Sequence, residues 1–328
     1  MTPKKRIVSG MRPTGALHLG NFHGALKNWI QMQDDYDCFF FVADWHALTS
    51  DYENPSYIKE FSRKMMIDWL GAGLSPEKST LFIQSHIPQH AELFLLLSMI
   101  TPVPWLERNP TYKEQIAELQ NKDLSTFGFL GYPILQAADI IIYKAEGVPV
   151  GVDQSPHIEI TREIARRFNY LYKAVFPEPA TILTESAKIL GTDRRKMSKS
   201  YDNAIFLSDP PEAIRKKTAT MITDPQRIKK SDPGDPDVCN VYSFHQMYSS
   251  PDLTETVNRD CRQAQIGCVA CKKKMAESLI EGLAPIREAT EYYHAHPEIV
   301  DEIIDRGNKA AAAQAKQTLD EVRAALKI

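Results

Sequence analysis

Apolar runs and amphipathic stretches alternate along the first half of the chain. Arg6–Gly10, Cys38–Val42 and Thr80–Ile83 are short and rich in apolar residues, which is typical of buried strands. Helix-like periodicity is expected at residues 18–33, 57–70, 88–100, 111–120, 132–143 and 154–168, and a further short strand at 148–150. This order predicts an α/β fold of the Rossmann type, a parallel sheet covered by helices, with an insertion between its halves.

The strand pattern ends at about residue 208, and helical patterns dominate beyond it. Pro210-Pro211 should open a helix, and the loop at 232–236 should interrupt the helical run. The last stretch, 301–327, is rich in alanine and amphipathic. We therefore expect a Rossmann-type domain over residues 1–207, a smaller all-helical domain over 208–300, and a C-terminal helix over 301–328 that packs back on the first domain.

Composition narrows the class of protein without naming a function. Charged residues make up 25% and hydrophobic residues 43% of the 328 positions, which is ordinary for a globular protein and excludes disordered and collagen-like chains. No apolar run reaches the roughly 18 residues that span a bilayer, so we expect a cytoplasmic protein without a membrane partner. The net charge of -3 means that an RNA partner would have to be held by local basic patches.

A glycine-containing turn follows the first predicted strand. Thr14-Gly15 is expected to make the turn, and Gly20 would let a purine or ribose lie against the start of the next helix. His18 and Asn21 are placed at that helix start to donate hydrogen bonds to phosphate oxygens. By itself such a turn is as well explained by a simple connection between two elements.

The second motif is Lys196–Ser200, with the sequence KMSKS, after the cationic segment Gly191–Arg195. Chance occurrence of this string in a chain of this length is on the order of one in ten thousand with uniform residue usage. We expect a mobile loop without an apolar face to dock. Its two lysines would wrap the β and γ phosphates of a nucleotide, whereas the alternative is a solvated charge run.

The two motifs resemble the HIGH and KMSKS signatures of class I aminoacyl-tRNA synthetases. The stretches SGMRPTG from Ser9, ADWHA from Ala43, YPILQAADI from Tyr132 and VPVGVDQ from Val148 resemble bacterial tryptophanyl-tRNA synthetases, from about residue 6 to 205. The resemblance implies activation of L-tryptophan by ATP, with Mg²⁺, and transfer of the adenylate to the 2′-hydroxyl of the terminal adenosine of tRNA(Trp). It also implies a homodimer, for which Trp105–Arg108 is a candidate contact region.

The resemblance also implies roles for individual residues. The catalytic set would be His18, Asn21, Lys196, Lys199 and Lys113, although Lys113 is equally well explained as a solvated helix lysine. ATP would contact Arg12, Thr14, Gly20, Asn21, Gly151, Asp153, Lys196, Met197, Ser198 and Lys199. Tryptophan would contact Val8, His46, Tyr132, Gln136, Asp139, Ile140, Val148, Val150 and Gln154.

Asp139 is the most informative member of the tryptophan set. Tyr132, Gln136, Asp139 and Tyr143 share one stripe of an otherwise apolar helix. A buried Asp needs a partner, and the indole N–H is a donor that could satisfy it, although a neighbouring Lys could do the same. Gln136 and Val8 depart from the family pattern, in which Met and an aromatic residue are common, so amino-acid selectivity is less secure than catalysis.

The cysteines form a second pattern. Cys261, Cys268 and Cys271 are spaced C-x6-C-x2-C, and Cys239 precedes them by 22 positions. In a cytosolic chain this spacing favours metal binding, and it fits a 4Fe-4S cluster, zinc or unliganded thiols. A subset of tryptophanyl-tRNA synthetases has a similar pattern with a 4Fe-4S cluster, one residue different in the longest gap. Arg262 and Lys272–Lys274 would offset the thiolate charge or meet tRNA phosphates, unless they form a plain solvated basic face.

Two other functions stay open on the sequence. A tyrosine-charging relative would share the fold and an acidic pocket residue. An RNA-binding iron-sulfur protein could keep the nucleotide fold without charging tRNA. The lysine motif and His18 speak against the latter, and the segment Tyr132–Ile140 speaks against the former.

Overall fold

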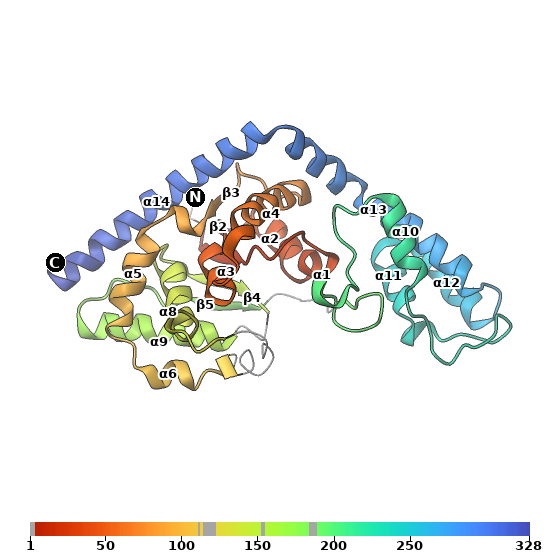
Figure 1. The fold of residues 1–328 in the computed structure, drawn as a ribbon, viewed down its shortest axis with the longest axis horizontal. Coiled ribbons are helices and arrows are strands. Elements are labelled where there is room, and N and C mark those ends of the chain that lie inside the picture. The colour runs from red at the N-terminus through yellow and green to blue at the C-terminus, as the bar shows by residue number, and fades with distance from the viewer. Residues whose placement is uncertain (1–3, 111, 114–122, 152–154, 184–188) are drawn as a thin grey trace. The chain divides into compact units, whose positions relative to one another are not determined.

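A five-stranded sheet organises the N-terminal part of the protein (Figure 1). The computed structural model describes residues 4–110, 112–113, 123–151, 155–183 and 189–328. The strands are β1 (Arg6–Met11), β2 (Asp37–Val42), β3 (Ser79–Ile83), β4 (Gly147–Val150) and β5 (Ala180–Leu183). Their order is β3-β2-β1-β4-β5, and every neighbouring pair is parallel. The predicted α/β fold of the Rossmann type is confirmed.

Helices cover the sheet and continue beyond it. In the sheet-containing region they are α2 (Lys27–Met32), α3 (Asp44–Asp51), α4 (Ile58–Ala72), α5 (Gln89–Ser98), α6 (Val103–Glu107), α8 (Phe127–Ile141), α9 (Ser155–Leu171) and α14 (Pro297–Leu326). The remaining ones are α1 (Leu19–Asn21), α10 (Pro211–Ala219), α11 (Asn240–Tyr248), α12 (Pro251–Arg262) and α13 (Cys268–Ala295). Among the described residues, no helix has the length and apolar character needed to cross a membrane.

The sequence pattern located most of these elements but missed three short ones. The edge strand β5 lacks a fully buried residue in its four positions, so it shows no buried apolar run. The helices α3 and α6 are eight and five residues long, which is too short for a clear periodicity. The single helix expected at 18–33 is instead divided, because a π-helical stretch at Phe22–Leu26 separates α1 from α2.

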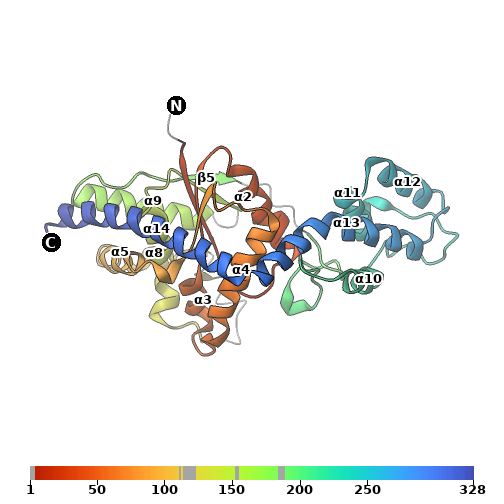
Figure 2. The ribbon, with the colours of Figure 1, turned by 90° about the horizontal axis from the view of Figure 1, so that it is seen from above.

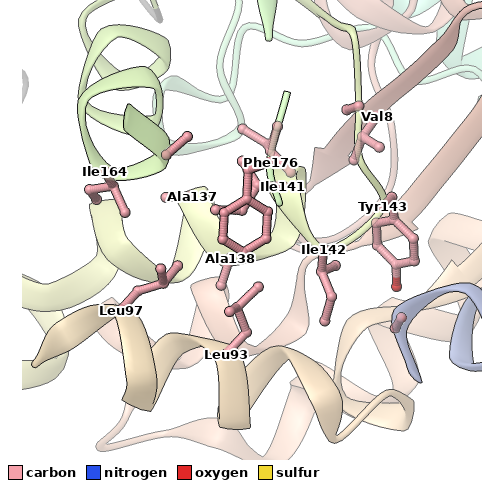
Figure 3. Close-up of a cluster of buried hydrophobic side chains, with 14 of the residues drawn as sticks. Val8, Leu93, Leu97, Ala137, Ala138, Ile141, Ile142, Tyr143, Ile164 and Phe176 are labelled. Carbon is pink, nitrogen blue, oxygen red and sulfur yellow. The ribbon is translucent and has the colours of Figure 1, made fainter. Parts of the chain in front are cut away.

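The core lies where α8 packs between α5 and α9, which lie beside it (Figures 1 and 2). Leu93 and Leu97 of α5 point toward Ala137 and Ala138 of α8 (Figure 3). The small alanine side chains let the two helices approach closely, and Phe176 fills space beside them. This packing fixes the position of α8, which carries Asp139.

The C-terminal helix α14 packs along β3 and α5. Its closest approach is at Gly307, where a Cβ atom would lie 1.8 Å from the carbonyl oxygen of Leu81. Only a residue without a side chain allows this contact between a helix and a strand backbone. Next to it, Asn308 also joins α14 to β3. Its side-chain oxygen accepts a hydrogen bond from the backbone of Ile83 at 3.1 Å.

By their contacts, the residues cluster into two compact units. One comprises Met1–Gly15, Ala25–Ser186 and Ala295–Ile328, and the other Ala16–Gly24 and Ala187–His294. These units differ from the expected domain boundaries at 207 and 300. The physical reason is that residues 17–19 form backbone hydrogen bonds with residues 205–207, which draws both segments into the helical unit. The boundaries of independently folding domains stay a prediction.

Replacing Gly307 with Ala should destabilise the sheet-containing unit by about 1–3 kcal/mol, because the new methyl group must push α14 away from β3. Urea unfolding followed by circular dichroism measures the change. Gly128→Ala in α8 is the matched control, since the nearest atom to its new Cβ would be 4.0 Å away. Equal stability of the two variants would contradict the close packing at Gly307.

Candidate active site

The first motif forms the capped start of α1. His18 is the N-cap residue, and its Nδ1 accepts a hydrogen bond from the backbone of Asn21 at 3.2 Å. In return the side-chain oxygen of Asn21 accepts from the backbone of His18 at 3.1 Å. Because Nδ1 acts as an acceptor, the ring hydrogen must sit on Nε2. The cap therefore fixes one tautomer of His18. Nε2–H of His18 and the side-chain amide nitrogen of Asn21 are not used in the cap and could donate hydrogen bonds to a ligand.

Gly20 is required by His18 itself. A Cβ at Gly20 would lie 2.9 Å from Cε1 of the His18 ring and 3.6 Å from Cβ of Met197. The sequence analysis assigned this glycine to close approach of a nucleotide. The structure adds that a larger residue would press on the ring of His18.

The second motif is held in a hydrogen-bonded loop. Met197 is buried, and its backbone donates to the carbonyl of Ile189 at 3.2 Å. The expectation of a loop without an apolar face to dock was therefore wrong, because Met197 supplies one. Lys196 is exposed and Lys199 partly buried, so the loop places its lysines on either side of a buried anchor.

Asn203 ties this loop together from within. Its side-chain oxygen accepts from the backbone of Ser198 at 2.8 Å, and its Nδ2 donates to Asp193 at 2.7 Å and to the carbonyl of Lys196 at 3.2 Å. Asn203 is buried, and a Cβ at Gly191 would lie 2.3 Å from its amide group. The sequence pattern did not point to Asn203, which is a polar residue three positions after the motif.

The two motifs lie together in the helical unit. The backbone of Leu19 donates to Ile205 at 3.0 Å, and that of Leu207 donates to Leu17 at 2.9 Å. His18 pairs with Phe206 in an antiparallel bridge between them. Burial, followed by the charges of Lys199 and Lys196, lowers the pKa of His18 to about 4. His18 is thus neutral near pH 7 and beside two cations.

A separate cavity of about 290 Å³ lies in the sheet-containing unit. The described residues of the expected tryptophan set all line it, namely Val8, His46, Tyr132, Gln136, Asp139, Ile140, Val148 and Val150. Its lining also includes residues that the sequence analysis did not single out, namely Ser9, Gly10, Phe41, Ala43, Thr49, Phe129 and His157. Tyr143, which shares the sequence stripe with Tyr132, is not among the lining residues.

Asp139 is fully buried and richly hydrogen-bonded. Its Oδ2 lies 2.7 Å from Nε2 of His46, and its Oδ1 lies 2.5 Å from Nδ1 of His90. The amide nitrogen of Gln84 donates to both oxygens at 2.9 Å. Burial alone would raise the pKa of Asp139, but the hydrogen bonds from the two histidines outweigh it and hold the pKa below its ordinary value. The partners of Asp139 in the structure are therefore two histidines and an amide. The neighbouring lysine that the sequence left open as a partner is not among them.

Arg12 and Tyr132 add polar groups to the same cavity. Arg12 contacts the hydroxyl of Ser50 and lies 3.6 Å from Asp51, and its buried Nε has no hydrogen-bond partner among the residues that the structure describes. The hydroxyl of Tyr132 lies 3.3 Å from Nε2 of His157. A buried guanidinium nitrogen in need of an acceptor is suited to an anionic group of a ligand.

The other expected ligand residues are less constrained. Thr14 is exposed in the turn after β1, where Gly15 adopts a positive φ of 110°. Gly151 follows β4, and Lys113 has an exposed side chain at a helical position, where its backbone N–H donates to the carbonyl of Asn109. Asp153 and Gln154 lie outside the described residues.

The cysteines Cys239, Cys261, Cys268 and Cys271 gather in the helical unit as free thiols. Burial, followed by the nearby charges of the other three, raises the pKa of the Cys271 thiol to about 12. Over the described part of the chain, no group of three or more His, Cys, Asp or Glu side chains is arranged to hold a metal ion.

Arg227, a cation that the sequence pattern did not point to, lies close to two of these thiols. Its Nη1 lies 3.7 Å from the sulfur of Cys261 and 3.9 Å from that of Cys268. Of the residues expected there, Arg262 pairs with Asp237 and also interacts electrostatically with Cys261, whereas Lys272 donates to the carbonyl of Ala219. Arg227 is 34 residues from Cys261 in sequence, so spacing gave no signal for this contact.

Comparisons with known proteins agree with this geometry. The family model of class I tRNA synthetases (W and Y) matches residues 2–284. The tryptophan–tRNA ligase of Thermotoga maritima is 52% identical over 98% of this chain and 99% of its own, and that of Ralstonia nicotianae is 45% identical over 98% of each. The crystal structure of tryptophanyl-tRNA synthetase from Campylobacter jejuni, complexed with ADP and tryptophan, superimposes with a TM-score of 0.91 at 30% identity, over 98% of this chain and 100% of that one. The chain therefore belongs to the class I aminoacyl-tRNA synthetases, in the family of the bacterial-type tryptophanyl-tRNA synthetases.

Proposed function

We propose that the protein is a tryptophan–tRNA ligase. It would activate L-tryptophan with ATP, release pyrophosphate and transfer the tryptophanyl group to the terminal adenosine of tRNA(Trp). The observation that carries the choice of amino acid is the ionised, fully buried Asp139 at an otherwise largely apolar cavity. A carboxylate in such a place accepts hydrogen bonds and cannot donate one, so it favours an apolar side chain that carries a hydrogen-bond donor, as indole does in its N–H.

The walls of the cavity support an indole. Val8, Ile140, Val148 and Val150 provide aliphatic surface, and Phe41 and Phe129 provide aromatic surface. Gln136, Tyr132 and Arg12 supply polar atoms that would orient the amino and carboxylate groups of the amino acid. Gln154 would also contact the amino acid, a role that rests on the family resemblance alone.

The chemistry of activation requires little more than positioning and charge stabilisation. The amino-acid carboxylate is ionised at neutral pH and attacks the α-phosphorus of ATP without a general base. Negative charge grows on the departing pyrophosphate, and Lys196 and Lys199 would neutralise it. Neutral His18 would donate from Nε2, since its tautomer is fixed by the cap at Asn21.

The remaining ATP contacts are proposed from the family resemblance. Arg12, Thr14, Gly20, Gly151, Asp153, Met197 and Ser198 would surround the nucleotide as the family pattern implies. Mg²⁺ would share the charge of the phosphates with the lysines. Lys113, which is exposed, would reach the phosphates only if its long side chain turns toward them.

The helical region over 208–300 would bind the anticodon end of tRNA(Trp). Lys229, Lys230 and Lys273 line a groove of about 600 Å³ with Ile228, which is exposed, and Cys268. Lysines beside an exposed apolar side chain suit phosphates next to an unstacked base.

We infer further that Cys239, Cys261, Cys268 and Cys271 hold a 4Fe-4S cluster. Mutual electrostatic influence among the four thiols supports this, because it requires them to be near one another. In such a cluster each thiolate binds a different iron, so the four sulfurs must surround a volume and need not converge on one ion. When bound, the cluster would fix the junction of α11, α12 and α13, and Arg227 would offset part of its negative charge.

A homodimer in the cytoplasm completes the proposal. Leu95 of α5, Met99 directly after α5, Val103 of α6 and Phe127 of α8 are all more than half exposed. These side chains would be covered in a dimer. In the earlier candidate segment Leu106 is buried, so its neighbours Trp105, Glu107 and Arg108 would take part.

Tryptophan-dependent exchange of pyrophosphate into ATP tests the proposed function. We expect exchange with tryptophan and at least a hundredfold less with tyrosine, because the para hydroxyl of a phenol ring cannot occupy the position of the indole N–H while the ring fills the same cavity. Exchange that depends on tyrosine would favour the tyrosine-charging alternative. Silence with both amino acids would favour an RNA-binding protein without ligase activity.

Lys199→Ala should lower the rate of adenylate formation about a hundredfold or more while tryptophan affinity changes less than about threefold. The ammonium acts on charge that develops mainly in the transition state. Single-turnover kinetics and equilibrium dialysis with labelled tryptophan measure the two quantities. Lys216→Ala, an exposed lysine of α10 in the same unit, is the control. Equal losses of rate and affinity in Lys199→Ala would contradict the proposed role.

Protein purified without oxygen should contain about four iron and four acid-labile sulfide per chain and absorb near 400 nm. Cys268→Ser should lose most of both, whereas Cys38→Ser, which alters the buried cysteine in β2, should keep them. Stoichiometric zinc, or wild-type protein with neither metal, would reject the cluster.

A further inference from the structure

A chain of buried polar side chains lies behind the Asp139 carboxylate. His90 of α5 contacts Oδ1 of Asp139 through Nδ1 at 2.5 Å, and its other nitrogen, Nε2, lies 2.6 Å from the hydroxyl of Tyr143. His90, Tyr143 and Gln84 are all completely buried. The described lining of the cavity includes Asp139 and His46 but none of these three. They therefore support the carboxylate without facing the cavity.

The direction of each hydrogen bond follows from the groups involved. An ionised carboxylate only accepts, so Nδ1 of His90 must carry the hydrogen that faces Asp139. Burial raises the pKa of Tyr143 well above its ordinary value, so its hydroxyl keeps its hydrogen and can donate to Nε2 of a neutral His90 ring. In this arrangement Tyr143 selects the tautomer of His90, and His90 in turn orients Asp139.

Packing leaves His90 little freedom to move. Its ring makes edge-on contacts with Phe41, Phe82 and Tyr143, with ring centroids 5.4–6.2 Å apart. Tyr143 is held in turn against Phe39 and Phe82, and it lies at the end of α8 beside Ile142 (Figure 3). The ring of His90 is thus fixed by aromatic surfaces as well as by two hydrogen bonds.

Only one of the donors to Asp139 is on the cavity side. Gln84 and His90 bond to the carboxylate from behind, whereas His46 both lines the cavity and contacts Oδ2. A carboxylate has about four acceptor positions, and the three residues together use them. A ligand N–H that enters the cavity therefore competes with His46 alone, while the rear donors keep the acceptor in place.

We propose that His90, locked by Tyr143, is a positioning residue that sets the selectivity of the cavity for a side chain carrying an N–H donor. The inference rests on the proposed function and names the device behind the recognition of indole. Removal of the Nδ1–H donor would leave Asp139 less fixed and less able to remain ionised. A mobile or neutral carboxyl group could then turn a hydroxyl toward a ligand without a donor, and discrimination would fall.

The test compares tryptophan with 3-benzothienylalanine, in which sulfur replaces the indole N–H and the shape is nearly unchanged. Exchange of pyrophosphate into ATP gives kcat and KM for each amino acid in wild type, His90→Leu, His90→Asn and Tyr143→Phe. The Leu variant removes the donor with a side chain of similar bulk. The Asn variant keeps an N–H close to the position of Nδ1, and Tyr143→Phe removes only the tautomer lock.

His90→Leu should lower kcat/KM for tryptophan about ten- to hundredfold, mainly through KM, and change that for the analogue less than about threefold. His90→Asn should restore most of the preference for tryptophan. Tyr143→Phe should reduce the preference about three- to tenfold, because it removes a neutral hydrogen bond one step away. The KM for ATP should stay the same in all three variants.

Equal losses for both amino acids would show a merely structural role for His90 and overturn the inference. If His90→Leu fails to fold, an unchanged preference for tryptophan in Tyr143→Phe would overturn the inference, provided that thermal unfolding shows Tyr143→Phe to be folded. Failure of the proposed function is distinguishable, because wild-type protein would then show no exchange with tryptophan at all. Wild type that exchanges with tryptophan but does not prefer it over the analogue would instead refute Asp139 as the indole acceptor.

Discussion

The proposed phosphate-binding site depends on the backbone hydrogen bonds between residues 17–19 and 205–207. Leu19 donates to Ile205 and Leu207 donates to Leu17, so two segments nearly 190 residues apart in sequence become neighbours. Their pairing places His18 within reach of the charges of Lys199 and Lys196, and burial, followed by these two charges, lowers the pKa of His18. Without that pairing the two sequence motifs would be separate loops.

In the sheet-containing unit, the central interaction is the set of hydrogen bonds to the buried carboxylate of Asp139. Asp139 is taken out of water completely, and an isolated carboxylate there would protonate. Donors from His46, His90 and Gln84 keep it ionised. Burying a carboxylate with three donors around it costs free energy. This cost has a function if the carboxylate recognises a donor on a ligand. A hydrophobic residue would serve packing alone as well or better.

Sequence patterns predicted the parts of the structure that local chemistry determines. Buried strands such as Cys38–Val42 show continuous apolar runs, and the helix that carries Asp139 has a clear polar stripe, so both could be located. The residues that position the site could not. Asn203, His90 and Arg227 act through contacts with residues distant in sequence or through side-chain direction, and neither leaves a periodic pattern.

The loop around Lys196–Ser200 illustrates the same limit. Its composition is cationic and polar, which suggested a segment without an apolar anchor. Burial of Met197 and the hydrogen bonds of Asn203 depend on the fold around the loop, so composition alone could not reveal them. The four cysteines were predicted only in part. Their spacing predicted that they lie together, but the contact with Arg227 became visible only in the structure.

Residue-resolved hydrogen exchange at the backbone amides of Leu19 and Leu207 tests the central pairing most directly. Both amides belong to one hydrogen-bonded ladder, so they should open together, show equal protection, and slow by the same factor when ATP is added. Exchange of either amide at the rate of an unprotected peptide, or slowing of only one of them by ATP, would contradict the account.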